Sequence, residues 1–161
     1  MQWETVTDVI LIAAIAVLGV FGLLGLIEWI SRKSLKKVDK ELIGMIVPML
    51  LMAATYFIFD KFLILNTRPN GSGEPSFPSS HTMVVATIFF CVMLALPKYI
   101  TNKPLRIFLD IVMLALITLT TTGRVLSNMH WLSDVLGGLG FAIIFALIYY
   151  FIKKHHQKES K

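Results

Sequence analysis

Charged residues are scarce in this chain: only 16% of its 161 residues are Asp, Glu, Lys or Arg, whereas 56% are hydrophobic. A soluble protein of this size could not remove so much apolar surface from water, so the composition excludes an ordinary soluble domain and predicts an integral membrane protein. Cysteine is nearly absent too. The single one, Cys91, excludes an internal disulfide and lies in an apolar run, where we interpret it as a small core residue.

The few charges separate five apolar segments, each close to the roughly 20 residues that a helix needs to cross the hydrocarbon core of a bilayer. We therefore predict one all-α membrane domain over residues 1–161, a bundle of about five transmembrane helices. The predicted spans are about 9–27, 42–59, 79–96, 105–122 and 135–152.

Glycines and one acid mark expected contacts within these spans. In the last span, Gly137, Gly138 and Gly140 predict close packing beneath the preceding polar segment, and the glycines at 19, 22 and 25 suggest the same for the first. Asp110 follows Arg106 by four residues, and we expect an ion pair between them at the end of the fourth span away from the motifs.

The distribution of positive charge predicts the orientation. Twelve of the fifteen Lys and Arg residues follow the first span, follow the third span or lie in the C-terminal tail. The positive-inside rule then places the C-terminus in the cytoplasm and the N-terminus outside, in a multi-pass protein of the cell (plasma) membrane. Because these charges are explained by topology, we expect no nucleic acid partner. Three cations break the trend and fall at the outer end: Lys61, Arg68 and Arg124.

The longest polar segment, residues 66–80, reads N-T-R-P-N-G-S-G-E-P-S-F-P-S-S and predicts a loop, since Gly, Pro and Ser dominate it. Connections of this length are often functional. Ser79 and Ser80 would open the next helix, where free N–H groups and the helix dipole favour an anion. His81 would follow them, placed to protonate a departing oxygen.

A second polar segment, G-R-V-L-S-N-M-H-W-L-S-D at residues 123–134, brings together Arg124, His130 and Asp134. If the segment is helical, His130 and Asp134 lie one turn apart on one face, so the carboxylate could accept the Nδ1–H and leave Nε2 as a nucleophile. The planar guanidinium of Arg124 suits phosphate oxygens. Taken singly, an arginine at a membrane edge is usually an anchor, and a histidine there usually has its hydrogen bonds satisfied without any role in catalysis. Together these residues predict a phosphoryl-transfer site at the outer end.

Three motifs with matching order and spacing resemble the signatures of the type 2 phosphatidic acid phosphatase (PAP2) superfamily: Lys61-x6-Arg68-Pro69, Pro78-Ser79-Ser80-His81 and Gly123-Arg124-x5-His130-x3-Asp134. The commonest forms of these motifs have glycine at position 80 and serine at position 123. Membrane members commonly have six spans with both termini inside, whereas this chain has five predicted spans.

The resemblance implies a role for each candidate residue. His130 would be the nucleophile that forms a phosphohistidine, Asp134 its partner and His81 the acid. Hydrolysis in this family needs no metal or other cofactor. The remaining candidates would bind the substrate phosphate: Lys61, Arg68, Ser79, Ser80 and Arg124.

The expected activity is hydrolysis of a lipid phosphate or pyrophosphate at the outer membrane face. Undecaprenyl pyrophosphate is the best candidate, and phosphatidylglycerol phosphate, lysophosphatidic acid and phosphatidic acid are close alternatives. A non-catalytic lipid-phosphate binder or transporter is a different class, which the two histidines and Asp134 argue against, because binding needs no nucleophile. Vanadate-dependent halide oxidation occurs in soluble relatives, and five predicted spans argue against it here.

Overall fold

The computed structural model describes residues 2–159, apart from the side chains of residues 36 and 157–159. Its elements are α1 (Gln2–Arg32), η1 (Leu35–Lys37), α2 (Lys40–Lys61), α3 (Ser80–Tyr99), α4 (Lys103–Leu126) and α5 (Leu132–Glu159). Over the described residues, five helices are long and apolar enough to cross a membrane. The predicted all-helical bundle is therefore confirmed, and each of the five helices is longer than the span predicted for it.

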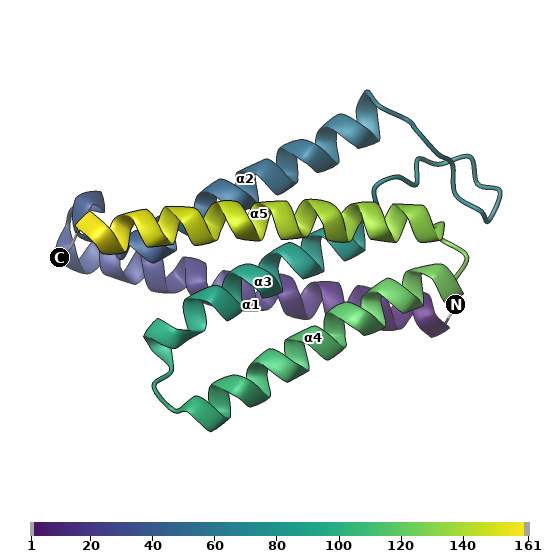
Figure 1. The fold of residues 1–161 in the computed structure, drawn as a ribbon. Helices are drawn as coiled ribbons and strands as arrows, with labels where there is room; N and C mark the ends of the chain where they lie inside the picture. Colours follow the sequence, from purple (N-terminus) through teal and green to yellow (C-terminus); the bar gives the residue numbers. More distant parts are fainter. Residues whose placement is uncertain (1, 160–161) are drawn as a thin grey trace.

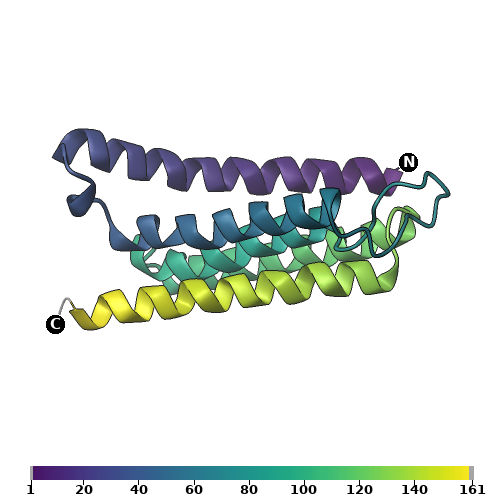
Figure 2. The same ribbon diagram turned by 90° about the horizontal axis from the view of Figure 1, so that it is seen from above.

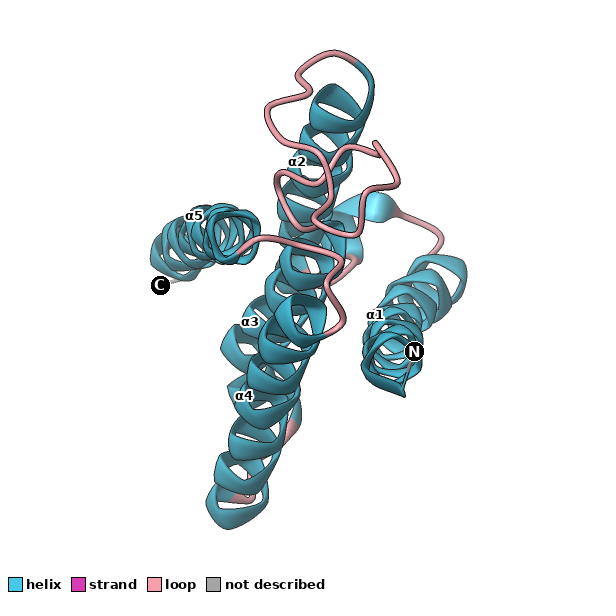
Figure 3. Cartoon of the chain, turned by 90° about the vertical axis from the view of Figure 1, so that its right-hand side faces the viewer, coloured by secondary structure: helices cyan, strands magenta, loops and turns pink. Residues whose placement is uncertain are grey.

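The helices form three layers around α3. In Figures 2 and 3, α2, α3 and α4 make the middle layer, with α1 on one side and α5 on the other. Helix α3 contacts all four other long helices and is the most buried of them. Its buried side chains, Cys91 among them, form much of the core. The outer faces of α1, α2, α4 and α5 are also apolar, as a lipid environment requires.

Two glycines set the distance between α5 and the start of α3. A Cβ atom at Gly137 would lie 2.3 Å from Cε2 of Phe77, and one at Gly138 would lie 2.8 Å from the Ser79 carbonyl oxygen. The predicted close packing is confirmed at these positions. It is wrong for Gly140, which has no atom of the described residues within 4 Å of such a Cβ. The same holds at positions 19 and 22, and Gly25 touches only a leucine side chain, at 3.8 Å.

Asp110 does not form the expected ion pair with Arg106. Its Oδ1 atom is buried and has no hydrogen-bond partner in the part of the chain that the structure describes. Asp110 does lie towards the start of α4, away from Arg124, as the sequence predicted.

The two ends of the bundle differ in composition (Figure 1). One end, which we name the site end, holds the start of α1, the loop of residues 62–79 and the turn of residues 127–131. The other, the basic end, holds the α1–α2 and α3–α4 connections and the end of α5. The three predicted motifs therefore meet at one end, and most of the cations lie at the other.

Ion pairs between helices close the basic end. Asp39 caps α2 by accepting from the Glu41 N–H at 3.0 Å, and its carboxylate also binds the Tyr99 hydroxyl at 2.7 Å and the Lys98 ammonium. Glu41 lies 3.3 Å from Lys153 of α5. Burial alone would raise the pKa of Asp39, but the hydrogen bonds from Lys98 and Tyr99 outweigh it and lower this pKa. These contacts tie α2 to α3 and α5.

Candidate active site

The turn between α4 and α5 sets the position of His130. The chain reverses over residues 127–131, where Asn128 adopts a positive φ of 58°, a conformation that Asn tolerates better than most residues. The Arg124 carbonyl accepts hydrogen bonds from the backbone N–H groups of His130 at 3.2 Å and Met129 at 3.3 Å. His130 thus precedes α5, and the expectation that it shares a helical face with Asp134 is wrong.

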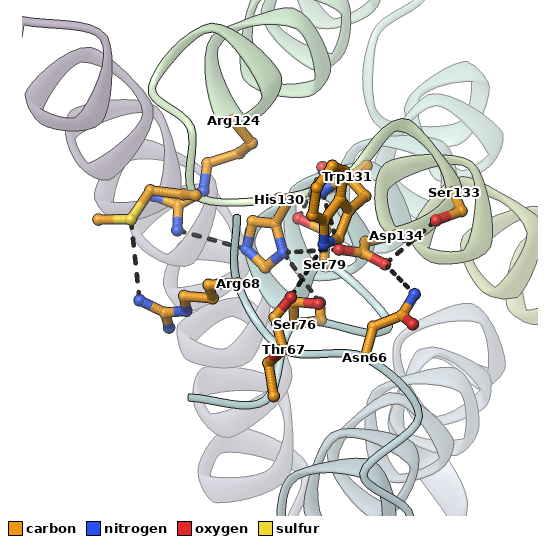
Figure 4. A network of polar contacts seen from close by, with 12 residues as sticks. Asn66, Thr67, Arg68, Ser76, Ser79, Arg124, His130, Trp131, Ser133 and Asp134 are labelled. Atoms are coloured by element: carbon orange, nitrogen blue, oxygen red, sulfur yellow. Dashed lines mark hydrogen bonds and ion pairs between the residues drawn. The ribbon is translucent and has the colours of Figure 1, made fainter. Parts of the chain in front are cut away.

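The two ring nitrogens of His130 have different partners (Figure 4). Nδ1 donates to the Ser76 carbonyl oxygen at 2.9 Å, and Nε2 faces Nη2 of Arg124 at 3.4 Å. The nearest Asp134 oxygen is 3.8 Å from Nδ1, which is too long for a hydrogen bond. A loop carbonyl therefore fixes the tautomer in place of the expected carboxylate. The result for Nε2 is the expected one: it keeps its lone pair.

Asp134 organises the backbone around the histidine. Its side chain is fully buried; Oδ2 accepts from the Trp131 N–H at 2.9 Å, and Oδ1 accepts from Nδ2 of Asn66 at 3.3 Å. Its carbonyl oxygen accepts from the Ser79 N–H at 2.9 Å. The indole of Trp131 donates to the Thr67 carbonyl at 2.9 Å, which fixes the loop a second time. Asp134 therefore joins the starts of α3 and α5 to the loop.

Burial keeps the imidazole of His130 neutral. The residue is 4% exposed. Its burial, followed by the positive charge of Arg124, lowers the pKa of His130 to about 4. At neutral pH the ring is therefore uncharged, with a lone pair on Nε2, which is the form that a nucleophile needs.

Two guanidinium groups lie on the Nε2 side of the ring (Figure 4). Arg124 is 3% exposed and reaches the Thr7 hydroxyl through Nη1 at 3.5 Å. Arg68 pairs with Glu74 at 2.8 Å. The Nε atoms of both arginines are buried and have no hydrogen-bond partner within residues 2–159. A buried donor without a partner costs about 1–3 kcal/mol, and an anion held between the two groups would remove that cost.

A cavity of about 50 Å³ lies beside His130. A water molecule occupies about 30 Å³ in the liquid, so the cavity suits a group of a few heavy atoms. Its walls come from α2, the loop, the start of α3 and the turn before α5, and its aromatic members are Tyr56, Phe59 and Phe77. Its polar members are Asp60, Arg68, Ser76, Ser80 and His130.

Three of the predicted phosphate-binding residues, Lys61, Ser79 and Arg124, are not among the residues that line this cavity, and neither is the predicted acid His81. Ser79 is the buried N-cap residue of α3, and its hydroxyl donates inwards to Thr82 at 3.1 Å. Lys61 is 61% exposed and pairs with Asp60 at 2.7 Å, outside the lining of the cavity. Ser80 does line it and is helical, so it needs none of the conformational freedom of glycine.

His81 has a partner that sequence reasoning missed. Its Nε2 atom lies 2.9 Å from Oδ1 of Asp8, which belongs to α1, while its Nδ1 atom is buried without a partner among the described residues. An acid at the edge of an apolar run, at the same end as three cations, was the available signal. The carbonyl of Ser76 gave none, because any residue supplies one.

Comparisons with known proteins identify the family and the fold. The family model described as the PAP2 superfamily matches residues 10–157. The chain belongs to the PAP2 superfamily. Its fold is similar to the crystal structure of a transmembrane PAP2-type phosphatidylglycerolphosphate phosphatase from Bacillus subtilis, with a TM-score of 0.69 and 19% identity over 98% of this chain and 77% of that one.

A curated relative shares part of the sequence. A lipid A 1-phosphatase of Porphyromonas gingivalis is 32% identical over 92 residues, which are 57% of this chain and 19% of that protein. The chain thus matches only about a fifth of the length of this relative.

One departure from the commonest PAP2 pattern has a physical reason. A Cβ atom at Gly123 would lie 2.7 Å from Cγ2 of Thr7 and 3.4 Å from the Trp3 ring. Glycine therefore lets α1 approach α4 closely at the position where the commonest PAP2 motif has serine. The Thr7 hydroxyl then meets Arg124 from the opposite helix.

Proposed function

We propose that this PAP2 protein is a membrane lipid phosphatase in which His130 is the nucleophile. The observation that carries the proposal is the way in which the two nitrogens of the buried His130 imidazole are held. Its Nδ1–H is held by the Ser76 carbonyl, and its Nε2 lies 3.4 Å from Arg124. Family membership and the two incompletely bonded arginines support the same conclusion.

In the first step, Nε2 of His130 attacks phosphorus and the bond from phosphorus to the leaving oxygen breaks. His81 gives that oxygen a proton. Arg68 and Arg124 stabilise the charge on the non-bridging oxygens, which is usually the largest contribution in phosphoryl transfer. The carboxylate of Asp134, 3.8 Å from Nδ1, stabilises the positive imidazole ring of the phosphohistidine.

In the second step, a water molecule attacks the phosphohistidine and gives its proton to His81. The phosphorus–nitrogen bond breaks, inorganic phosphate leaves and His130 returns to its neutral form. Each step uses only residues of this chain, in keeping with a reaction that we propose to be independent of metal ions.

The proposed substrate is a lipid phosphate or pyrophosphate, with undecaprenyl pyrophosphate as first candidate. Phosphatidylglycerol phosphate is the second, because the similar Bacillus subtilis structure is a phosphatase of that lipid. We propose a cell-membrane orientation with the site end outside. The twelve Lys and Arg residues that follow the first and third predicted spans or lie in the C-terminal tail support it through the positive-inside rule.

Phosphate release from a lipid panel in detergent tests the proposal. The panel contains undecaprenyl pyrophosphate, phosphatidylglycerol phosphate, lysophosphatidic acid and phosphatidic acid, each with and without a metal chelator. We expect turnover by the wild type that the chelator leaves unchanged, and a fall of at least about 10³-fold in His130→Ala. His155→Ala, which removes a histidine from the basic end, is the matched control and should keep full activity.

Three outcomes would contradict parts of this proposal. Undiminished turnover in His130→Ala would remove the nucleophile. Tight binding of a lipid phosphate by the wild type without phosphate release would favour the binder or transporter. Orthovanadate should inhibit by occupying the phosphate cavity, and full activity in its presence would contradict the assignment of that cavity.

A further inference from the structure

The first helix contributes side chains to the site although it carries none of the three motifs. The close approach at Gly123 brings one turn of α1 against the end of α4. Thr7 on this turn is buried and meets Arg124, and the neighbouring Asp8 lies 3.9 Å from Nη1 of the same arginine. The side chain of Asp8 is 50% exposed, so it stands at the mouth of the site.

Without Asp8, the charged groups that face the imidazole of His81 would all be positive. The charged groups that face this imidazole are Arg124 from α4, Arg68 from the loop and Asp8 from α1. Burial and the two guanidinium groups disfavour a proton on the ring, whereas an acid catalyst must carry one. The Asp8 carboxylate, 2.9 Å from Nε2, is the anion that offsets them.

The contact also assigns the two ring nitrogens of His81. Because Nε2 is bound to Asp8, the remaining nitrogen is Nδ1, which is buried and has no hydrogen-bond partner within the described chain. A histidine held at one nitrogen by a carboxylate has a fixed orientation, and its other nitrogen is free to exchange a proton with the substrate.

We propose that Asp8 is a positioning residue for His81: its carboxylate orients the ring through Nε2, directs Nδ1 to the leaving oxygen and offsets part of the positive charge of the two arginines. This inference rests on the proposed phosphatase function and adds to it a functional residue from outside the family motifs. A half-buried ion pair with a purely structural role would change no catalytic parameter selectively.

Asp8→Asn is the main test, because it keeps the size of the side chain and removes its charge. We expect kcat for the lipid substrate to fall about 10–10²-fold, as for the partial loss of an acid catalyst. Inhibition by inorganic phosphate should be unchanged or stronger, since a negative charge near Arg124 is lost. The alkaline limb of the pH–rate profile should move to lower pH, because the protonated imidazole has lost its anionic partner.

Two further variants provide the controls. Glu4→Gln removes the same charge from the same helix one turn earlier without changing a charge that faces His81, so it should leave kcat and the alkaline limb unchanged. Asp8→Glu keeps the carboxylate and should recover part of the kcat and of the alkaline limb. A thermal midpoint for each variant, measured in the same detergent, shows that the protein compared is folded.

A double-mutant cycle shows whether Asp8 acts through His81. The double variant Asp8→Asn/His81→Ala should be no slower than His81→Ala alone, whereas independent roles would multiply the two losses. An unchanged kcat and pH profile in Asp8→Asn would overturn the proposal. A higher kcat would also overturn it, since Asp8 would then be an anion that competes with phosphate.

Failure of the proposed function would appear in a different comparison. If the wild type and His130→Ala release phosphate equally, the nucleophile is wrong whatever Asp8 does. If His130→Ala is inactive and Asp8→Asn is fully active, only the role of Asp8 is wrong. Absence of turnover by the wild type on the whole panel would refute both.

Discussion

Both ends of the bundle bury charged groups, and they satisfy them differently. At the basic end, Asp39 binds Lys98 and Tyr99, and Glu41 lies 3.3 Å from Lys153, close enough for an ion pair although its Oε2 atom lacks hydrogen-bond geometry. At the site end, polar atoms remain buried without partners in the described chain: Nε of Arg68 and Arg124, Nδ1 of His81 and Oγ of Ser76. Oδ1 of Asp110, nearer the basic end, also lacks a partner in the described chain. The ion pairs at the basic end hold helices together, whereas the unpartnered groups at the site end gather around the motif residues and leave their hydrogen-bonding capacity to a ligand.

The comparison predicts that variants at the basic end lose stability and keep activity, whereas variants at the site end lose activity and keep stability. Lys153→Met leaves Glu41 buried without its cation, and breaking a buried pair costs about 3–5 kcal/mol. We therefore expect a clear fall in the unfolding midpoint in detergent, with normal turnover by the protein that remains folded. Lys154→Met is the matched control, because Lys154 is exposed beside Tyr150 and its loss should change stability by no more than about 0.5 kcal/mol.

At the site end, Arg124→Lys keeps the charge and removes the planar fork. We expect kcat/KM to fall about 10²–10³-fold, comparable to the loss of one donor that stabilises a transition state. The unfolding midpoint should change little, because Nε of this arginine has no hydrogen-bond partner in the described chain. Arg106→Lys, near the opposite end of α4, should retain full activity. A large loss of stability in Arg124→Lys would show that this arginine holds the fold in the way that Lys153 does.

A third test concerns the packing between α3 and α5, where we expect one substitution to lower both stability and activity. Gly138→Ala would place its Cβ 2.8 Å from the Ser79 carbonyl, so α5 must move away from the start of α3. Overpacking of this kind costs about 1–3 kcal/mol. Activity should fall as well, since Asp134 accepts from the Ser79 N–H across the same contact. Gly140→Ala meets open space and should be neutral or stabilising by up to about 1 kcal/mol, from helix propensity alone.

The smallest expected effect concerns pH. The pKa of His130 is lowered from 6.5 to about 4, so the acid limb of kcat/KM should lie near pH 4 and not near 6.5. In the unfolded chain the same imidazole takes up its proton near pH 6.5, so stability should decrease as the pH falls from there towards about 4. His130→Gln should lack this contribution in thermal scans. A limb near 6.5 would mean that the ring is not desolvated as its burial indicates.

Patterns that repeat along the chain were readable from the sequence, and single contacts between distant segments were not. Apolar run lengths predicted the five helices, and motif spacing predicted that Arg124 and His130 meet. The partner of Nδ1 was misassigned to Asp134 because the spacing of four suggested a helix, whereas a turn precedes α5. Asp8 was missed because its contacts with the site depend on how closely α1 approaches Gly123, which is a property of the packing between helices.

The hydrogen bond from His130 to the Ser76 carbonyl has one more consequence. The acceptor is a main-chain oxygen, which remains when any side chain is replaced, so alanine scanning would not detect this contact. The backbone conformation between Asn66 and Ser79 therefore determines which ring nitrogen of His130 carries the proton. The nucleophile would lose its fixed tautomer if this loop were shortened or its backbone were rearranged, and not if a single side chain in it were changed.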